Sequence, residues 1–322
     1  ERVENDRIIS IDILSEQEMR SVSQSFFRRS AVILIFAVLC TLLWGSAYPG
    51  VKIGYDLFHI PNDDVWGQLL FAGSRFSLAG LLVLPRREAL PAILLLGFVQ
   101  TTLEYVFFYI GLSHTTGVKG SILNATETFL AVILAHFVYS NDKLTRPKVL
   151  GCAVGFAGVV VINWGGGMDA HFTLTGEGFI MLAAASFAVG SLISKWAASL
   201  EDSMLVTGWQ LLFGGALLAA AGLMGGARLT IPSPQALGLL LYLAALSAVA
   251  FTLWTLLIKY NPVSKISIYN FLTPVFGVLL SGIFLHESFL SVKNLSALIL
   301  VCIGITLVNK AGEQPESLQT TA

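Results

Sequence analysis

Ten apolar runs constrain what this chain can fold into, because a helix needs ~20 apolar residues to cross the ~30 Å hydrocarbon layer of a bilayer. The alternation of polar and apolar residues that marks a barrel strand is missing from them. They predict an all-α integral membrane protein with ten transmembrane helices. The runs lie at 32–52, 66–84, 91–112, 119–139, 147–163, 178–197, 205–224, 236–257, 266–285 and 294–309.

The composition agrees with a membrane environment and narrows the function. Of the 322 residues, 55% are hydrophobic and 12% are charged, whereas soluble domains carry roughly 25% charged residues. The net charge of −1 gives no sign of nucleic-acid binding. Cys40, Cys152 and Cys302 stand singly in apolar runs, without a CxxC or His/Cys ligand spacing. We therefore expect neither a metal site nor a cofactor.

Charged residues divide the chain and set its expected orientation. We expect a polar tail at 1–29, five-helix units at 30–164 and 176–310, and a second tail at 311–322. Lysine and arginine gather in the connections on the side of the N-terminus, which predicts that both termini are cytoplasmic. The residues on that side are Arg28, Arg29, Arg86, Arg87, Lys143, Arg146, Lys148, Lys195, Lys259 and Lys310, with Lys265 close by.

The two five-helix units share an internal repeat. KGSILNATETFLAVILA from Lys119 and KISIYNFLTPVFGVLLS from Lys265 match at Lys, Ser, Ile and Asn, 146 residues apart. The same separation relates Gly158 to Gly304 and Leu144 to Leu290. Because five is odd, the second unit would enter the membrane from the opposite side. Such inverted repeats are typical of secondary transporters, whose site lies near the midplane between the halves.

Three ionisable residues, Arg75, Glu104 and Glu127, lie near mid-depth in the apolar runs. A charge at the bilayer centre costs ~2.5–3.5 kcal/mol, so these residues are expected to face an interior cavity. One interpretation is an ion pair between Arg75 and either glutamate. The other is a carboxylate that binds substrate or exchanges a proton. We predict Glu127 and Glu104 as substrate or proton sites, and Arg75 as their counter-ion or a carboxylate anchor.

Matched polar and aromatic residues complete the predicted site. Asn124 and Asn270 occupy equivalent positions on stripes of small residues. Helix packing explains the small residues alone, and the two asparagines are expected as paired hydrogen-bonding groups. Aromatic side chains near mid-depth can pack or line a cavity. The predicted cavity walls are Trp44, Tyr48, Tyr105, Trp254 and Tyr269.

Proline and glycine positions predict local distortions and close contacts. Pro49 and Pro274 lie inside spans, where each removes an amide donor and can act as a hinge or shape the cavity. Gly151 and Gly155 form a GxxxG that permits close helix contact, inside one protomer or between protomers.

Several of these features resemble the EamA domain. They are WGS from Trp44, RF at Arg75-Phe76, the GxxGxxxxN that closes span five, and FLTPVFGVLLSGIFLHES in the second half. Two copies cover residues 31–310, so the whole resembles a ten-span member of the drug/metabolite transporter superfamily. The resemblance implies a carrier of the bacterial inner membrane, usually an exporter of amino acids or other metabolites. It also implies a cavity lined by spans one to four and six to nine.

The first half departs from this pattern at two positions. Thr128 stands where the family has a proline, and Asn141 where it has an acidic residue. The second half keeps both, with Glu287 as the acidic residue.

The expected function is secondary active export of a small metabolite, either amino acid-like or a cationic or aromatic compound, by alternating access. Proton coupling through the glutamates is one option. The alternatives are a channel or a non-transporting membrane interaction protein. An intramembrane enzyme is disfavoured, since His286-Glu287 begins an HExxH motif that Leu290 fails to complete. The expected partners are a small-molecule substrate and the lipid bilayer, with no nucleic acid, and the chain as a monomer or weak homodimer.

Overall fold

The fold comes from a computed structural model that describes residues 22–61, 63–80, 87–115, 123–163, 172–284 and 292–311, and within these ranges the chain forms helices and no strands. Most of both predicted tails, together with Ser121, His286 and Glu287, lies outside the described residues. The elements are α2 (Ser30–Leu57), α3 (Val65–Ala79), α4 (Leu90–Leu96), η1 (Gly97–Leu103), α5 (Glu104–Ser113), α7 (Thr126–Val138), α8 (Arg146–Asn163), η2 (Leu174–Gly178), α9 (Phe179–Leu200), α10 (Ser203–Met224), α11 (Pro234–Tyr260), α12 (Val263–Ser267), η3 (Ile268–Phe271), α13 (Leu272–Phe284) and α14 (Val292–Ala311).

Each predicted apolar run overlaps one of these helical stretches. Within the part of the chain that the structure describes, five stretches are long and apolar enough to cross a membrane, at Ser30–Leu57, Leu90–Leu112, Leu174–Leu200, Ser203–Met224 and Pro234–Tyr260. Thr126–Val138 and Leu295–Asn309 are apolar but shorter. Within the described residues the chain is therefore all-helical, and its long apolar helices fit a membrane protein. The number of ten crossings and the inversion of the second half stay predictions.

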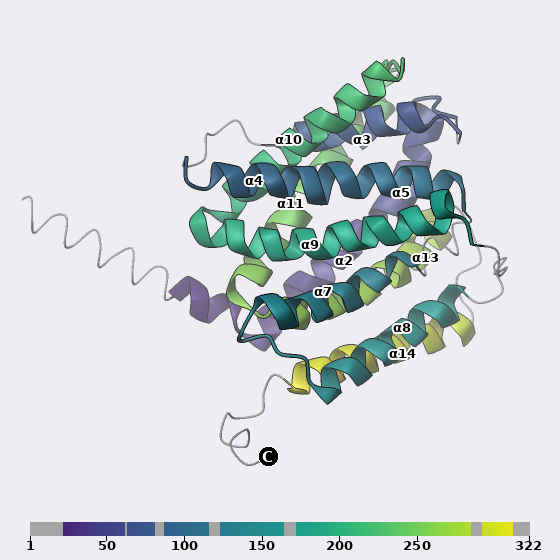
Figure 1. The fold of residues 1–322 in the computed structure, drawn as a ribbon. Coiled ribbons are helices and arrows are strands. Elements are labelled where there is room, and N and C mark those ends of the chain that lie inside the picture. The colour runs from purple at the N-terminus through teal and green to yellow at the C-terminus, as the bar shows by residue number, and fades with distance from the viewer. Residues whose placement is uncertain are drawn as a thin grey trace, which may run out of the picture.

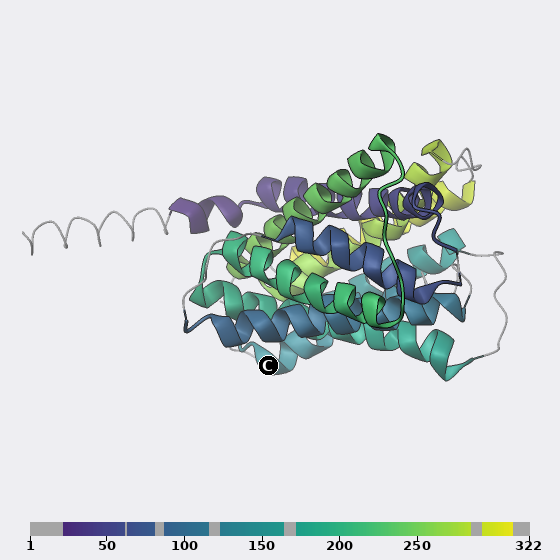
Figure 2. The ribbon, with the colours of Figure 1, turned by 90° about the horizontal axis from the view of Figure 1, so that it is seen from above.

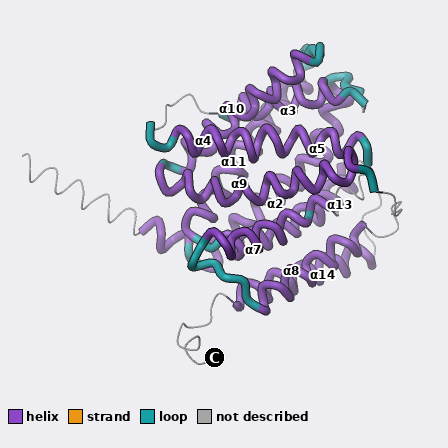
Figure 3. Tube along the Cα trace, in the orientation of Figure 1, coloured by secondary structure: helices purple, strands orange, loops and turns teal. Residues whose placement is uncertain are grey.

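The helices run side by side, and their connections gather at two ends of the bundle (Figures 1 and 3). Seen from above, the bundle is elongated along the helix axes (Figure 2). The beginning of α2 and the end of α14 lie at the same end, on the left of Figure 1. We call this the terminal end, and the other the distal end.

The most extensive contacts between helices follow a two-fold pattern. Helix α2 packs against α11 and α13, and α9, the corresponding helix of the second half, packs against α5 and α7. Two further pairs, α3 with α10 and α8 with α14, join corresponding helices directly. Exchanging the two halves leaves this set of contacts unchanged. Such an exchange is what an internal repeat with a two-fold axis would produce.

Helices α8 and α14 form an intimate pair along one edge of the bundle (Figure 1). A Cβ atom on Gly304 would lie 2.6 Å from the carbonyl oxygen of Gly151 and 2.7 Å from the amide nitrogen of Gly155. The backbones approach this closely because neither helix carries a side chain there. The GxxxG of α8 thus serves a contact inside the chain.

Three interruptions of helical geometry bring polar groups to the middle of the bundle. The wide π-helical turns of η1 end immediately before Glu104. The η3 segment has 3₁₀ geometry and contains Asn270, four residues before Pro274, which lacks the N–H that would bond the Asn270 carbonyl. In the first half a turn at Ala125 separates Asn124 from α7. The matched asparagines therefore both lie where their spans are broken.

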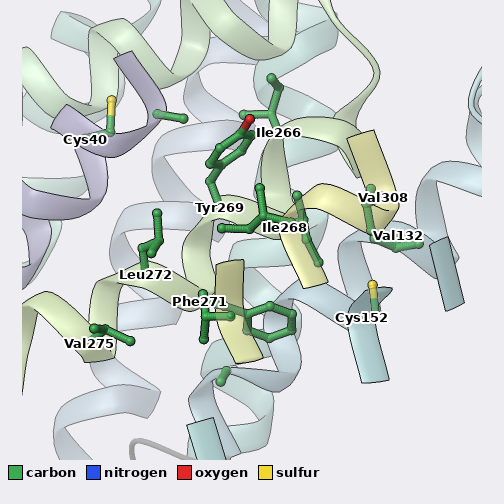
Figure 4. Close-up of a cluster of buried hydrophobic side chains, with 14 of the residues drawn as sticks. Cys40, Val132, Cys152, Ile266, Ile268, Tyr269, Phe271, Leu272, Val275 and Val308 are labelled. Atoms are coloured by element: carbon green, nitrogen blue, oxygen red, sulfur yellow. The ribbon is translucent and has the colours of Figure 1, made fainter. Parts of the chain in front are cut away.

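The largest hydrophobic cluster joins α2, α11 and the two spans that carry the asparagines to the α8–α14 pair (Figure 4). Phe271 from η3 packs directly against Gly155 of α8. Cys40 and Cys152 are buried in the same cluster. Their roles are those of small apolar packing residues, as their surroundings in the sequence suggest.

Candidate functional site

A cavity of about 400 Å³ lies between the two halves of the bundle. Its walls come from α2, α3, α5, α7, α9, α11, η3 and α13, while α8, α10 and α14 contribute none of the residues that line it. The first half provides Trp44, Ala47, Tyr48, Val51, Lys52, Tyr55, Arg75, Glu104, Tyr105, Phe108, Tyr109, Leu112, Asn124 and Glu127, and the second half Phe187, Leu246, Ser247, Phe251, Asn270 and Thr273.

The cavity occupies the distal half of the bundle. Helix α2 begins at Ser30 and reaches the cavity only at Trp44, about 21 Å further along its axis. From Trp44 to Tyr55 the cavity then follows α2 for about 16 Å. Tyr48 keeps 41% of its surface accessible although it lies between these two residues, because its ring faces the hollow.

Arg75 is the cation in the middle of the site. It is 4% exposed, and its guanidinium carbon lies 4.4 Å from the ring centre of Phe76 and 5.8 Å from that of Tyr105. These ring faces stabilise a buried cation without neutralising it. Its Nε and Nη1 atoms have no hydrogen-bond partner, and no salt bridge joins it to Glu104 or Glu127 among the described residues. The guanidinium therefore keeps unused donors beside the cavity.

Glu127 belongs to the first half and faces the cavity residues that the second half contributes. It is in the first turn of α7, where the helix dipole favours a negative charge. The Asn270 side chain lies beside its carboxylate, yet neither amide atom of Asn270 has a hydrogen bond of normal geometry. The hydroxyl of Thr273, the repeat equivalent of Glu127, is also without a partner among the described residues. An unsatisfied buried polar group costs about 1–3 kcal/mol, so water or a polar ligand that paired with this cluster would be stabilised.

Glu104 is the second acidic residue of the cavity and lines it together with Glu127. Its Oε2 atom has no hydrogen-bond partner among the described residues. The π-helix before it is held by second-half contacts, since Gln210 Nε2 donates to Gln100 Oε1 at 2.9 Å and Thr102 Oγ1 donates to the Gly214 carbonyl at 3.3 Å. Wide turns of this kind are frequent at functional sites.

Lys52 also lines the cavity, although it stands at the end of the first predicted apolar run and was not predicted for the site. It could have been found from the sequence, because Trp44, Tyr48 and Lys52 follow one another at intervals of four on one face of α2. The cavity wall thus carries two cations, Lys52 and Arg75, and two carboxylates.

Two predicted wall residues do not line the cavity. Trp254 is buried behind Trp44, with the ring centres 5.1 Å apart. Tyr269 belongs to the hydrophobic cluster (Figure 4). Its hydroxyl accepts a hydrogen bond from Asn309 Nδ2 at 2.8 Å. Both side chains therefore support the wall from outside. The other residues predicted for the site, polar and aromatic, lie on its surface.

Comparison with known proteins identifies the family to which this chain belongs. Residues 31–164 and 174–310 each match the EamA-like transporter family. The chain belongs to this family. Its acidic cavity residues, Glu104 and Glu127, both fall in the first of the two matched segments.

Two relatives cover nearly the whole chain. The Bacillus subtilis (strain 168) protein named "Uncharacterized transporter YvbV" is 30% identical over 295 residues, or 87% of this chain and 92% of that protein. The "Probable amino-acid metabolite efflux pump" of Salmonella typhimurium (strain LT2) is 26% identical over 84% of this chain and 92% of that protein. These names point to a membrane transporter rather than an enzyme.

A solved structure shares the fold. The chain titled "Crystal structure of protein" superposes with a TM-score of 0.71 and 18% sequence identity, covering 90% of this chain and 100% of the other.

Proposed function

We propose that this protein is a secondary carrier of the bacterial inner membrane that exports a small zwitterionic metabolite with an apolar or aromatic body. The observation that carries the proposal is the cavity between the halves, which holds unpartnered buried groups able to bind opposite charges. At about 400 Å³ it is near the lower end of the ~300–1,000 Å³ typical of ligand pockets, which suits a metabolite.

The anionic pole of the substrate would lie at Arg75. A guanidinium presents a planar fork of donors that matches a carboxylate. Two of these nitrogen atoms are unused in the structure. The rings of Phe76 and Tyr105 hold the fork in place. A carboxylate bound here would satisfy donors that otherwise stay buried without partners.

The cationic pole would lie at the glutamates. Glu127, Glu104 and the amide oxygen of Asn270 offer acceptors to an ammonium group, and Asn124 lines the same part of the cavity. A zwitterion adds no net charge to a buried wall that carries Lys52, Arg75, Glu104 and Glu127. Trp44, Phe108 and Phe187 supply the apolar surface between the poles.

The proposed mechanism is alternating access by a ten-span inverted repeat. Support comes from the exchange symmetry of the helix contacts and from the position of the cavity in the distal half. A two-fold relation between inverted halves gives two states of similar energy that expose the site to opposite sides. Protonation of one glutamate on one side only would couple transport to a proton gradient.

Counterflow into proteoliposomes tests this function. Vesicles loaded with unlabelled phenylalanine would take up labelled phenylalanine from outside, and phenethylamine and phenylpropanoate would compete less well because each lacks one charged pole. Glu127→Gln would abolish most of the uptake, whereas Glu88→Gln, an exposed glutamate away from the cavity, would not.

Other outcomes would overturn parts of the proposal. Flux without counterflow would indicate a channel, and no flux of any of these compounds would leave the non-transporting alternative. Stronger competition by phenethylamine than by phenylalanine would replace the zwitterion with a cation. A pH gradient that accelerates wild type but not Glu127→Gln would assign proton coupling to this residue, and equal responses would remove it.

A further inference from the structure

The terminal end of the bundle is closed by polar contacts that cross between the halves, and this feature lies outside the cavity. Its centre is Asp142 in the connection from α7 to α8. Asp142 is 1% exposed, and its carboxylate accepts hydrogen bonds from the backbone amide and the hydroxyl of Ser264 in α12. The amide bond is 2.9 Å long. Asp142 belongs to the first half and Ser264 to the second.

Asp142 caps a helix that cannot cap itself. The residue before α12 is Pro262, and its side chain makes no cap hydrogen bond. The free amides and the positive dipole end of a helix N-terminus attract a carboxylate. Here the carboxylate comes from the other half of the molecule. The cap of the broken span that carries Asn270 therefore depends on the position of the first half.

Further contacts across the same end surround this cap. The side-chain nitrogen Asn261 Nδ2 donates to the Phe27 carbonyl at 2.9 Å, and Arg28 Nε donates to the Tyr260 carbonyl at 3.2 Å. The Tyr139 hydroxyl donates to the Leu192 carbonyl at 2.9 Å. In each bond one partner comes from the first half, or from the segment just before it, and the other from the second half.

We propose that the Asp142–Ser264 cap is a latch that holds the terminal end closed while the cavity is accessible from the distal end, and that it breaks in each transport cycle. The proposal rests on the carrier function proposed above. Lys148 donates to the Asp142 carboxylate at 2.7 Å from within the first half, so this ion pair survives when the halves separate. Water replaces the two bonds to Ser264. The carboxylate thus stays charged and solvated, and the latch can form again.

A purely structural cap would act differently. It would stabilise both conformations equally, and its loss would lower stability without changing which side of the membrane reaches the cavity. A latch is present in only one conformation, so its loss shifts the equilibrium toward the state that is open at the terminal end.

Asp202 provides a matched control. It caps α10 through Asp202 Oδ1, which accepts from the Met204 amide at 2.8 Å, and both residues belong to the second half. Asp142→Ala and Asp202→Ala each remove one helix cap. Only the first removes a bond between the halves.

The test measures access to Val51, which lines the cavity. A Val51→Cys reporter is placed in the full chain with Cys40, Cys152 and Cys302 replaced by alanine, in vesicles of both orientations, and labelled with a membrane-impermeant maleimide. Asp142→Ala should raise the ratio of the labelling rate from the terminal side to that from the distal side roughly tenfold, as expected for loss of a charge-assisted hydrogen bond. Asp202→Ala should change neither rate. Unchanged rates in Asp142→Ala would overturn the latch.

A cross-link covers the case in which Asp142→Ala fails to fold. In the Asp142→Cys, Ser264→Cys double variant, oxidation should join the halves at the terminal end. Counterflow should then stop and return with a reductant. Undiminished counterflow in the oxidised protein would overturn the latch while leaving the carrier function intact. Absence of counterflow even in the wild type would instead contradict the carrier function, and the labelling rates would still test the latch.

Discussion

The two broken spans that face each other across the cavity differ in the acidic residue that only one of them carries. Glu127 and Thr273 are equivalent positions in the repeat, and both line the cavity, as do the equivalent pair Asn124 and Asn270. The first half places a carboxylate where the second half has a hydroxyl. The repeat thus fixes where side chains lie, and single residues decide which half carries charge. An asymmetric substrate requires such a difference.

The largest effect is expected from moving the carboxylate. Glu127→Gln should reduce counterflow by roughly 10–100-fold, the loss expected for a hydrogen bond to a charged group. The double variant Glu127→Thr, Thr273→Glu restores the charge at the equivalent position and should recover part of this loss. Flux and thermal melting would be measured together. Recovery to wild-type flux would show that the position of the charge is unimportant, and the comparison between halves would lose its meaning.

Substitution of Arg75 tests the site proposed for the anionic pole of the substrate. Arg75→Lys keeps the charge but loses the planar fork, and should weaken competition by carboxylate-bearing compounds about tenfold. Competition by phenethylamine should be unchanged, because an amine has nothing to place there. The measurement is the concentration of each compound that halves counterflow. An equal loss for the amine and the zwitterion would indicate that Arg75 supports the fold of the cavity instead.

Asn124 and Asn270 test a position at which the two halves carry the same residue. Asn124→Ala and Asn270→Ala should each raise the half-saturating substrate concentration about fivefold, as for the loss of one neutral hydrogen bond. If the effect of Asn270 is larger, the reason is its place beside Glu127. No effect from either would remove the amides from the binding site.

We expect substitution of the equivalent glycines Gly158 and Gly304 to have the smallest effect on transport. Its effect on stability should be clear. Gly158→Ala and Gly304→Ala each force a Cβ to within 3 Å of backbone oxygen atoms, and should lower stability by about 1–3 kcal/mol, as overpacking does. Gly238 of α11 has no atom within 4 Å of an added Cβ, so Gly238→Ala should be neutral or slightly stabilising. Melting temperatures in detergent would check the series. A stable Gly304→Ala would contradict the close α8–α14 contact.

The helices could be predicted from the sequence because length and apolarity define them. Which side of each helix faces the cavity could not be predicted. A span that is apolar all round gives no signal for which side meets a cavity, so Trp254 and Tyr269 were predicted as walls although they pack behind them. The glutamates and Arg75 were found because a charge in hydrocarbon needs an interior site. A charged residue in a connection between helices is not in hydrocarbon, so its position in the sequence does not indicate an interior site.

Asp142 shows this limit most clearly. The sequence comparison pointed to position 141 and found an asparagine where an acidic residue is expected. The structure places a buried carboxylate one residue further on. Nothing in the sequence links Asp142 to Ser264, because the pairing depends on how the two halves meet.

The π-helical turns of η1 determine where Glu104 points. Each residue along an α-helix advances the side-chain direction by about 100°, so the wider turns of residues 97–103 turn everything that follows relative to α4. If residues 97–103 closed into an ordinary α-helix of the same length, Glu104, Tyr105 and Phe108 would turn together away from the cavity. A change of backbone hydrogen bonding in this one stretch would therefore alter the lining of the site with every amino acid in place.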